Sequence, residues 1–466
     1  MPLETDIVEL KKKVFSEINW INYLENQKIG FGKIDLTSSF NSLFFTFLKL
    51  FFYNSEDNIY IEFIKKKTLC SSKKERVLFV KKISKHFLFG TKTDYRFLLI
   101  AEIIYSADIF NIDFNDSLKN CILKELGFKE KHFDKIIQQV KTISLFKDKR
   151  ILESFSCFYD FKNSLTEYNK LRIVNVGVCA AMSAGKSSFV NALLGYDYLP
   201  MRNEATTARI TSVSDNDNAE KLIGFTIHSN KILSVSRDLN TKTIDEWNSD
   251  NEVEHIILQG NLDNIGNDGV IVTVHDTPGT NNSGDTKHHD MTFEFLKNNK
   301  MDAIIFVANV EHLCTTDEAE LLKELYEKIV KPSGIPVIFA LNKADNIDTS
   351  KESIDSIIRK YNDFISEFGF TNSKILPVSS KAARLIKMSL YNHSCDFTES
   401  ECDTFPFIVN KFAKRLILDE CKTSVQNFNE ENITVDGEQY SVDLLNKALV
   451  HTGIQLIEKE IEVIIK

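Results

Sequence analysis

The pattern of apolar and polar positions divides the chain into two parts of different texture. From Leu3 to about Glu167, apolar residues recur three and four positions apart, with Lys and Glu between them and few glycines. This spacing places apolar side chains on one face of a helix. We therefore expect residues 1–167 to form an all-α N-terminal domain.

Near Leu171 the helical spacing gives way to short runs of β-branched residues. The first run, 171–179, ends in a loop of small residues, and similar runs follow at 270–274, 303–310, 337–341 and 375–378. Nearly continuous apolar runs that alternate with helical segments are typical of a mostly parallel sheet covered by helices on both faces. Residues 168–466 are thus predicted to form an α/β domain.

Helix boundaries are marked at several places in this second part. Thr315 and Glu318 have the spacing of a capping box, and Pro332 follows the apolar face of that helix. A second amphipathic helix over 354–365 is predicted to stop at Gly369. The last apolar run predicts a single helix over 444–465.

Two long segments have weaker patterns. Residues 214–268 are acidic and are predicted to be an insertion, and 384–440 a second insertion with a helix near 407–421. Neither contains a motif from which chemistry can be inferred. The sequence His288-His289-Asp290 is predicted to be a solvated polar loop in preference to a metal site.

Composition and charge restrict the class of protein. The chain has 466 residues, with 17 glycines, 7 prolines and 43% hydrophobic residues, which excludes collagenous, low-complexity and disordered proteins. Residues 1–170 hold 28 Lys and Arg against 22 Asp and Glu, whereas residues 171–466 hold 29 against 44. The mildly basic N-terminal part is therefore the better candidate for contact with an anionic surface.

The cysteines and the N-terminus indicate a reducing compartment. Eight cysteines are scattered without a C-x-x-C pair, and the first ten residues carry acids where a secretion signal needs bases. The most apolar stretch, 43–53, is about half the ~20 residues that a membrane-spanning helix needs. We expect a cytoplasmic protein, and interpret this stretch as a Phe-rich amphipathic helix in preference to a membrane-inserting wedge.

The strongest chemical signal lies at 180–187, between a predicted strand and a predicted helix. It fits the phosphate-loop pattern G-x-x-x-x-G-K-[ST], with Ala180 in place of the first glycine. Small residues let backbone N–H groups surround a β-phosphate at a helix N-terminus. Lys186 would neutralise β- and γ-oxygens, and the Ser187 hydroxyl would hold Mg²⁺. The predicted nucleotide contacts here are Ala184, Gly185, Lys186, Ser187 and Ser188.

Further motifs follow in the order that a GTPase requires. Thr206-Thr207 comes first, and Asp276-Thr277-Pro278-Gly279, Asn342-Lys343-Ala344-Asp345 and Ser379-Ser380-Lys381 each follow a predicted strand. Asp276 would hold Mg²⁺ through water, and the Gly279 backbone N–H would meet the γ-phosphate.

The third of these motifs predicts recognition of guanine. The Asp345 carboxylate can accept hydrogen bonds from guanine N1–H and the 2-amino group, which adenine cannot supply in this pattern. A buried acid left unpaired is costly, so this carboxylate would select GTP over ATP. Asn342 would bind the base or brace the loop, and the Lys343 stem would cover the base. The loop with Ser380 and Lys381 would close over O6.

With these motifs, residues 171–466 resemble the GTPase domain of dynamin-like large GTPases, especially the bacterial ones. The resemblance rests on residues 183–187, 191–195 with Leu199-Pro200, 206–208 and 452–458. It implies a P-loop GTPase domain with a mostly parallel sheet covered by helices. It also implies that Ser183 helps to neutralise charge between the β- and γ-phosphates, and that Thr207 holds Mg²⁺ and the attacking water.

The sequence departs from the family pattern at positions that matter for catalysis. Met182 stands where eukaryotic dynamins carry a water-orienting Gln, and Thr280 stands where small GTPases carry a catalytic Gln. No side chain is an obvious general base. These departures suggest slow hydrolysis that a dimer partner completes.

We therefore predict a GTPase that converts GTP to GDP and phosphate with Mg²⁺ as cofactor. Its predicted catalytic residues are Ser183, Lys186 and Thr207, and its predicted Mg²⁺ ligands are Ser187, Thr207 and Asp276. Self-association through the GTPase face is expected. Other expected partners are a second dynamin-like chain or stalk, and membrane lipid in a peripheral contact, but not nucleic acid. The alternative is a nucleotide-gated interaction module that binds GTP with little turnover.

The N-terminal helices leave two possibilities open. Residues 97–140 resemble the small helical module of tellurite-resistance proteins, so the helices could close on themselves. Alternatively they await a stalk from a longer chain or a second protein, since the chain stops about where the GTPase domain's last helix should end. The second is favoured, because Phe44, Phe45, Phe47, Phe51 and Phe52 provide more aromatic surface than a small bundle usually buries.

Overall fold

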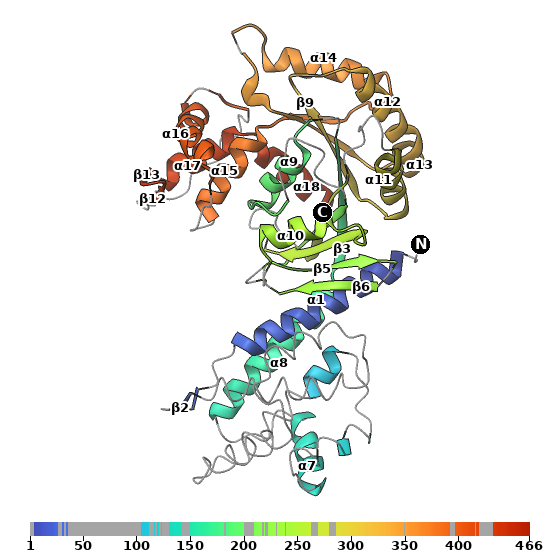
Figure 1. Ribbon diagram of the computed structural model, residues 1–466, viewed down its shortest axis with the longest axis vertical. Coiled ribbons are helices and arrows are strands. Elements are labelled where there is room, and N and C mark those ends of the chain that lie inside the picture. Colours follow the sequence, from blue (N-terminus) through green and yellow to red (C-terminus); the bar gives the residue numbers. More distant parts are fainter. Residues whose placement is uncertain are drawn as a thin grey trace. The chain divides into compact units, whose positions relative to one another are not determined.

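The computed structural model divides the chain into two compact units, residues 5–170 and 171–466 (Figure 1). The residues that it describes are 4–26, 30–31, 34–35, 104–110, 116, 119–120, 123, 130–141, 149–180, 183–199, 209–216, 219, 222–229, 231–237, 239–261, 269–278, 286–348, 350–391, 397–414, 416–418 and 432–466. The division falls three residues after the predicted boundary, because one helix continues to Lys170. That each unit folds as a domain of its own stays a prediction.

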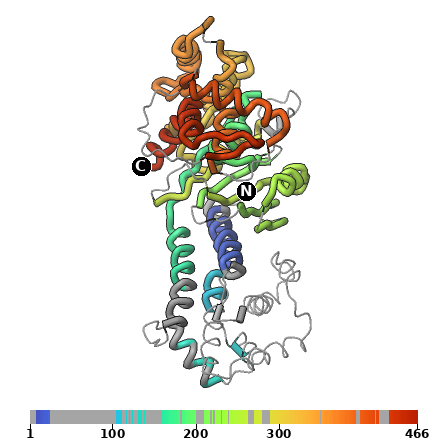
Figure 2. The backbone as a smooth tube through the Cα atoms, turned by 90° about the vertical axis from the view of Figure 1, so that its left-hand side faces the viewer, coloured from blue at the N-terminus to red at the C-terminus, as the bar shows by residue number. Residues whose placement is uncertain are grey.

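The first unit is built on two long helices, α1 (Glu4–Asn26) and α8 (Lys149–Lys170), which lie side by side (Figure 2). The Tyr23 and Phe161 rings stack with their centroids 3.9 Å apart, and the Lys12 ammonium donates to the Asn169 carbonyl at 2.5 Å. Trp20 is fully buried and its indole N–H donates to Ser106 Oγ at 2.9 Å. These contacts bury the apolar face that the spacing predicts for the first helix.

The rest of the described first unit is mostly helical. It includes α7 (Glu130–Lys141), and a two-residue antiparallel pair, β1 (Gly30–Phe31) with β2 (Ile34–Asp35), which departs from the predicted all-α character. So short a pair can form within a turn, where no alternating pattern reveals it. The five phenylalanines of 44–52 lie outside the described residues, so the choice between a closed module and a stalk stays a prediction.

The second unit is an α/β domain around a nine-stranded sheet, in the order β11-β10-β9-β3-β8-β4-β7-β5-β6 among the described residues. The strands are β3 (Arg172–Ala180), β4 (Ile210–Asp215), β5 (Ile223–His228), β6 (Lys231–Ser236), β7 (His255–Gly260), β8 (Val270–Asp276), β9 (Ala303–Asn309), β10 (Val337–Asn342) and β11 (Lys374–Pro377). The pairs from β11 to β8 are all parallel, and β4 reverses direction beside β8. The five predicted strands are confirmed as β3, β8, β9, β10 and β11, which are neighbours and all run parallel.

Helices cover both faces of this sheet (Figure 1). Alternate residues of β9 face two different hydrophobic cores, one on each face of the sheet. Ile305 and Val307 pack in the first core, and Ile304 and Phe306 pack in the second. The first core is shared with α9 (Lys186–Leu194), α10 (Thr241–Ser249), α15 (Ser380–Tyr391), α16 (Glu399–Lys414), α17 (Val442–His451) and α18 (Ile454–Ile465). The second is shared with α11 (Thr286–Asn298), α12 (Thr316–Leu325) and α14 (Ile354–Ser366). The mostly parallel sheet covered on both faces confirms the predicted fold class.

The segment 214–268 is part of the sheet, which corrects its description as a weakly patterned insertion. It supplies β5, β6 and β7, which extend the sheet, and α10. Polar residues interrupt its strands, but they pair across the sheet: Thr226 Oγ1 lies 3.0 Å from Ser234 Oγ. Cross-strand pairing of this kind is a long-range feature that an alternation pattern misses.

The last predicted helix is two helices, α17 and α18, which are separated at Thr452-Gly453. Gly453 has φ 79°, and a Cβ there would lie 2.1 Å from the Pro377 carbonyl oxygen. The Thr452 carbonyl accepts from the Ser379 backbone N–H at 2.9 Å. The backbone at the break is therefore hydrogen-bonded to the loop after β11. Apolar spacing along the sequence cannot predict this contact.

Two helices differ from their predicted bounds, and one predicted loop is helical. The capping box is confirmed, since Thr315 Oγ1 accepts from the Glu318 N–H at 3.3 Å, but the helix continues through a π-helix, η2 (Tyr326–Val330), into α13 (Lys331–Ser333). Pro332 therefore lies inside that last turn. Helix α16 starts at Glu399 and contains Pro406, so it begins earlier than the predicted 407–421. His289 and Asp290 lie in α11 and not in a loop.

The helix over 354–365 is confirmed as α14, and Gly369 follows it with φ 101°. Among the described residues, no helix is both long and apolar enough to cross a membrane.

Candidate functional site

The phosphate loop lies between β3 and α9. Gly185 caps α9 in the left-handed region (φ 79°), and a Cβ there would lie 2.8 Å from Asn342 Nδ2. Ser183 also has positive φ, 56°, and its side chain is exposed. Both residues turn the chain sharply before the helix, so the first backbone N–H groups of α9 are directed back toward the loop.

Lys186 and Asp276 meet in the protein interior. The Lys186 ammonium is hydrogen-bonded to Asp276 Oδ1, and the two side chains are 8% and 1% exposed. Strands β3 and β8 are parallel neighbours, so the loop after β3 and the end of β8 lie at the same edge of the sheet. Thr277 Oγ1 donates to the Val178 carbonyl at 2.9 Å and fixes this junction. The predicted phosphate ligand and the predicted Mg²⁺ ligand are thus adjacent.

The oxygen donors at this edge suit Mg²⁺. Ser187 lies in the first turn of α9, half-buried, and the Asp276 carboxylate is buried at the end of β8. A hydroxyl and a carboxylate are the hard donors that Mg²⁺ accepts beside substrate phosphates. The other predicted groups of this region, Thr206, Thr207 and Gly279, lie outside the described residues, as do Met182 and Thr280.

Asn342 joins the phosphate loop to the loops predicted for the base. Its Nδ2 donates to the Ala184 carbonyl at 2.7 Å, and its Oδ1 accepts from the Ser380 backbone N–H at 3.1 Å. Both amide groups are therefore used within the protein. Of the two predicted roles, the structure favours bracing of the loops over direct contact with the base.

Asp345 and Lys343 project from a loop of fixed conformation after β10. Lys343 has φ 61°, and the Ala344 N–H donates to the Val378 carbonyl at 3.1 Å. Asp345 is half-buried, and its carboxylate is hydrogen-bonded to no side chain in the described part of the chain. Lys343 Nζ lies 3.5 Å from Glu311 Oε2. Hydrogen bonds to the backbone thus fix the loop from which the Asp345 carboxylate projects.

The loop after β11 completes this region. Ser380 is buried, its backbone N–H reaches Asn342, and its Oγ has no hydrogen-bond partner among the described residues. A buried hydroxyl without a partner is uncommon in folded proteins and is consistent with a ligand group beside it. Lys381, the next residue, is exposed.

Two contacts at the site were not predicted from sequence. Thr452 supports Ser379, as described above, and the Lys411 ammonium of α16 donates to the Asp345 carbonyl at 2.5 Å. Residue 411 lies in the segment from which no chemistry could be inferred. Its contact spans 66 positions, and no local pattern predicts such a pair.

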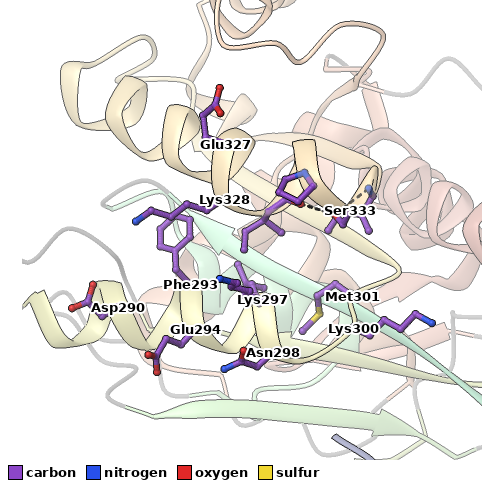
Figure 3. A pocket seen from close by; sticks show the side chains of 14 residues that line it. Asp290, Phe293, Glu294, Lys297, Asn298, Lys300, Met301, Glu327, Lys328 and Ser333 are labelled. Carbon is purple, nitrogen blue, oxygen red and sulfur yellow. Dashed lines mark hydrogen bonds between the residues drawn. The ribbon is translucent and has the colours of Figure 1, made fainter.

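A surface cavity of about 970 Å³ lies apart from this site, between α11 and the segment formed by η2 and α13 (Figure 3). Phe293, Met301 and Ile329 form apolar wall, and Lys297 and Lys328 lie beside them. None of its lining residues belongs to the predicted nucleotide site.

Comparison with known proteins supports the motif analysis over part of the chain. Residues 176–344 match the family model of the dynamin family. This segment includes the phosphate loop, Asp276, Asn342 and Lys343, and it ends at Ala344, one residue before Asp345.

The proteins that are similar to this chain include two related sequences and one solved structure. An uncharacterized protein in the xynA 3′ region of Caldicellulosiruptor sp. (strain Rt8B.4) is 30% identical over 217 residues, 46% of this chain and 50% of that protein. Uncharacterized protein R618 of Acanthamoeba polyphaga mimivirus is 25% identical over 191 residues, 39% of this chain and 30% of that protein. The chain thus spans half or less of these relatives. A structure of an oligomerised bacterial dynamin pair, described as a mechanism for long-range sensing and tethering of membranes, is 16% identical over 85% of this chain and 60% of that one, with a TM-score of 0.35.

Proposed function

Because residues 176–344 match the dynamin family model, we propose that this chain binds GTP and hydrolyses it to GDP and phosphate with Mg²⁺. One observation carries the proposal: Asn342 joins Ala184 of the phosphate loop to Ser380. Asp345 follows Asn342 by three positions, and no side chain in the described part of the chain is hydrogen-bonded to its carboxylate. These hydrogen bonds connect the phosphate loop with the two loops that would bind the guanine base. Adenine would leave that carboxylate without its donors.

The positions of the residues suggest which part of the nucleotide each would bind. The α9 N-terminus and the backbone of Ala184 and Gly185 would surround the β-phosphate. Lys186 would exchange Asp276 for phosphate oxygens, and Ser183 would neutralise charge between the β- and γ-phosphates. Gly279 would bind the γ-phosphate through its N–H.

Mg²⁺ would be held by Ser187 and Thr207 and by Asp276 through water, with Thr207 also orienting the attacking water. When bound, the ion neutralises charge on the phosphates. Ser188 is assigned to the nucleotide by its place in the first turn of α9. Lys343, Ser380 and Lys381 are assigned to the guanine base by their loops.

We propose that hydrolysis depends on self-association through the nucleotide face. Neither Met182 nor Thr280 supplies the amide that orients water in related enzymes, so a second copy would complete the site. A cytoplasmic location, contact with a second dynamin-like chain or stalk, and peripheral contact with membrane lipid belong to the same proposal, which includes no nucleic-acid partner.

Specific GTPase activity is expected to rise with protein concentration, because the complete site needs two chains. Single-turnover hydrolysis of GTP with Mg²⁺, measured over a 100-fold range of protein concentration, tests this. Light scattering in the presence of a transition-state mimic would report the dimer. A rate constant that does not vary while the protein stays monomeric would contradict self-association. Tight GTP binding with no turnover at any concentration would instead support the nucleotide-gated interaction module.

A further inference from the structure

Helix α16 contacts the loop after β10 through the Lys411 side chain. Lys411 lies in the last turn of this helix, and its ammonium donates to the carbonyl of Asp345 at 2.5 Å. The contact is partly buried, which makes a hydrogen bond from a charged donor stronger than at a free surface. It is made to the residue whose carboxylate is proposed to read the base.

The helix that carries Lys411 is firmly held. Phe405, Val409 and Phe412 are buried in the core, and the Phe412 carbonyl lies 2.7 Å from His451 Nδ1 of α17. The Leu416 N–H donates to the Lys411 carbonyl at 3.0 Å. Lys411 therefore projects from a helix that is fixed against the core.

The neighbouring residues also restrict the Lys411 side chain. Its Nζ lies 5.9 Å from the centroid of the Phe407 ring, one turn earlier on the helix, and that ring is 63% exposed. A cation near an aromatic face is attracted to it. Lys414 provides a contrast in the same last turn, because it is exposed and contacts only Asn410 within its own helix among the described residues.

We propose that Lys411 is a positioning residue for guanine recognition. By holding the Asp345 carbonyl, it fixes the direction of the Asp345 carboxylate toward the N1–H and 2-amino groups of the base. The inference rests on the proposed function. It places a determinant of nucleotide specificity in α16, outside the residues that match the dynamin family.

The test is a set of GDP and IDP dissociation constants, measured with Mg²⁺ by calorimetry. Inosine lacks the 2-amino group, so the ratio of the two constants reports how well Asp345 is placed. Lys411→Met keeps the side-chain stem and is expected to weaken GDP binding about tenfold and IDP binding much less. Lys411→Arg should restore most of the ratio, and Lys414→Met should bind like the wild type.

The outcomes separate this inference from the proposed function. Equal losses for GDP and IDP in Lys411→Met would show a general effect on the fold and would overturn the inference. A variant that binds GDP like the wild type would overturn it as well, while leaving guanine recognition intact. A wild-type protein that binds ADP as tightly as GDP would overturn both.

Discussion

Replacing Lys186 with alanine is expected to destabilise the nucleotide-free protein and to remove tight GTP binding together. Lys186 and Asp276 are an ion pair with almost no exposure, so removal of the ammonium takes the neighbouring positive charge away from a buried carboxylate. Breaking a buried pair from one side costs about 3–5 kcal/mol in other proteins. Loss of charged hydrogen bonds to phosphate should weaken GTP binding roughly 100-fold or more.

The two effects can be measured separately. Urea denaturation gives the free energy of unfolding, and titration at a temperature where the variant is folded gives the affinity. Because the two charges are buried together, the double variant with Lys186→Ala and Asp276→Ala should lose less free energy of unfolding than the two single variants lose in sum. Lys331→Ala, which removes an exposed pair with Glu327, is the control and should change stability little. Additive losses at 186 and 276 would contradict the buried pair.

Replacing Asp345 with asparagine is expected to transfer specificity from guanine to xanthine. The carboxylate of aspartate can accept two hydrogen bonds from the base, whereas the amide of asparagine accepts one hydrogen bond and donates one. Guanine offers two donors there, and xanthine offers the N1–H and a C2 carbonyl. Each charged hydrogen bond contributes enough to change affinity by roughly 10- to 100-fold, so GTP affinity should fall and XTP affinity should rise by factors in this range.

Asp348→Asn is the matched control for that variant. Asp348 lies three residues later in the same loop, and its carboxylate is used by the Ser350 hydroxyl and by Lys351. The Asp348→Asn variant should still bind GTP more tightly than XTP, as the wild type is expected to do. If Asp345→Asn also kept that order in competition titrations, the assignment of Asp345 to the guanine base would be wrong.

The parts of the fold that sequence predicts well are those set by local pattern. The runs 270–274 and 303–310 become β8 and β9 because continuous apolar residues suit a strand that is buried on both faces. The Thr315 cap was predictable because its partner lies three residues away. The phosphate loop was predictable because glycine at 185 satisfies both a positive φ and a close approach by Asn342.

The parts that sequence missed depend on distant contacts. The helix break at Gly453 is set by the Pro377 carbonyl, 76 positions earlier in the chain. The antiparallel strands β5 and β6 were missed because their polar residues are paired only across the sheet. Lys411 was missed for the same reason, since a lysine in the last turn of a helix has no local feature that points to Asp345.

The central claim is that this site recognises guanine nucleotides, and a competition titration of the wild-type chain tests it most directly. A fluorescent GDP analogue bound with Mg²⁺ would be displaced by GTP, ATP and XTP in turn. Because the Asp345 carboxylate is proposed to reject bases that lack the N1–H and 2-amino donors, GTP should compete at least about 100-fold more effectively than ATP. Equal competition by ATP and GTP would contradict the account.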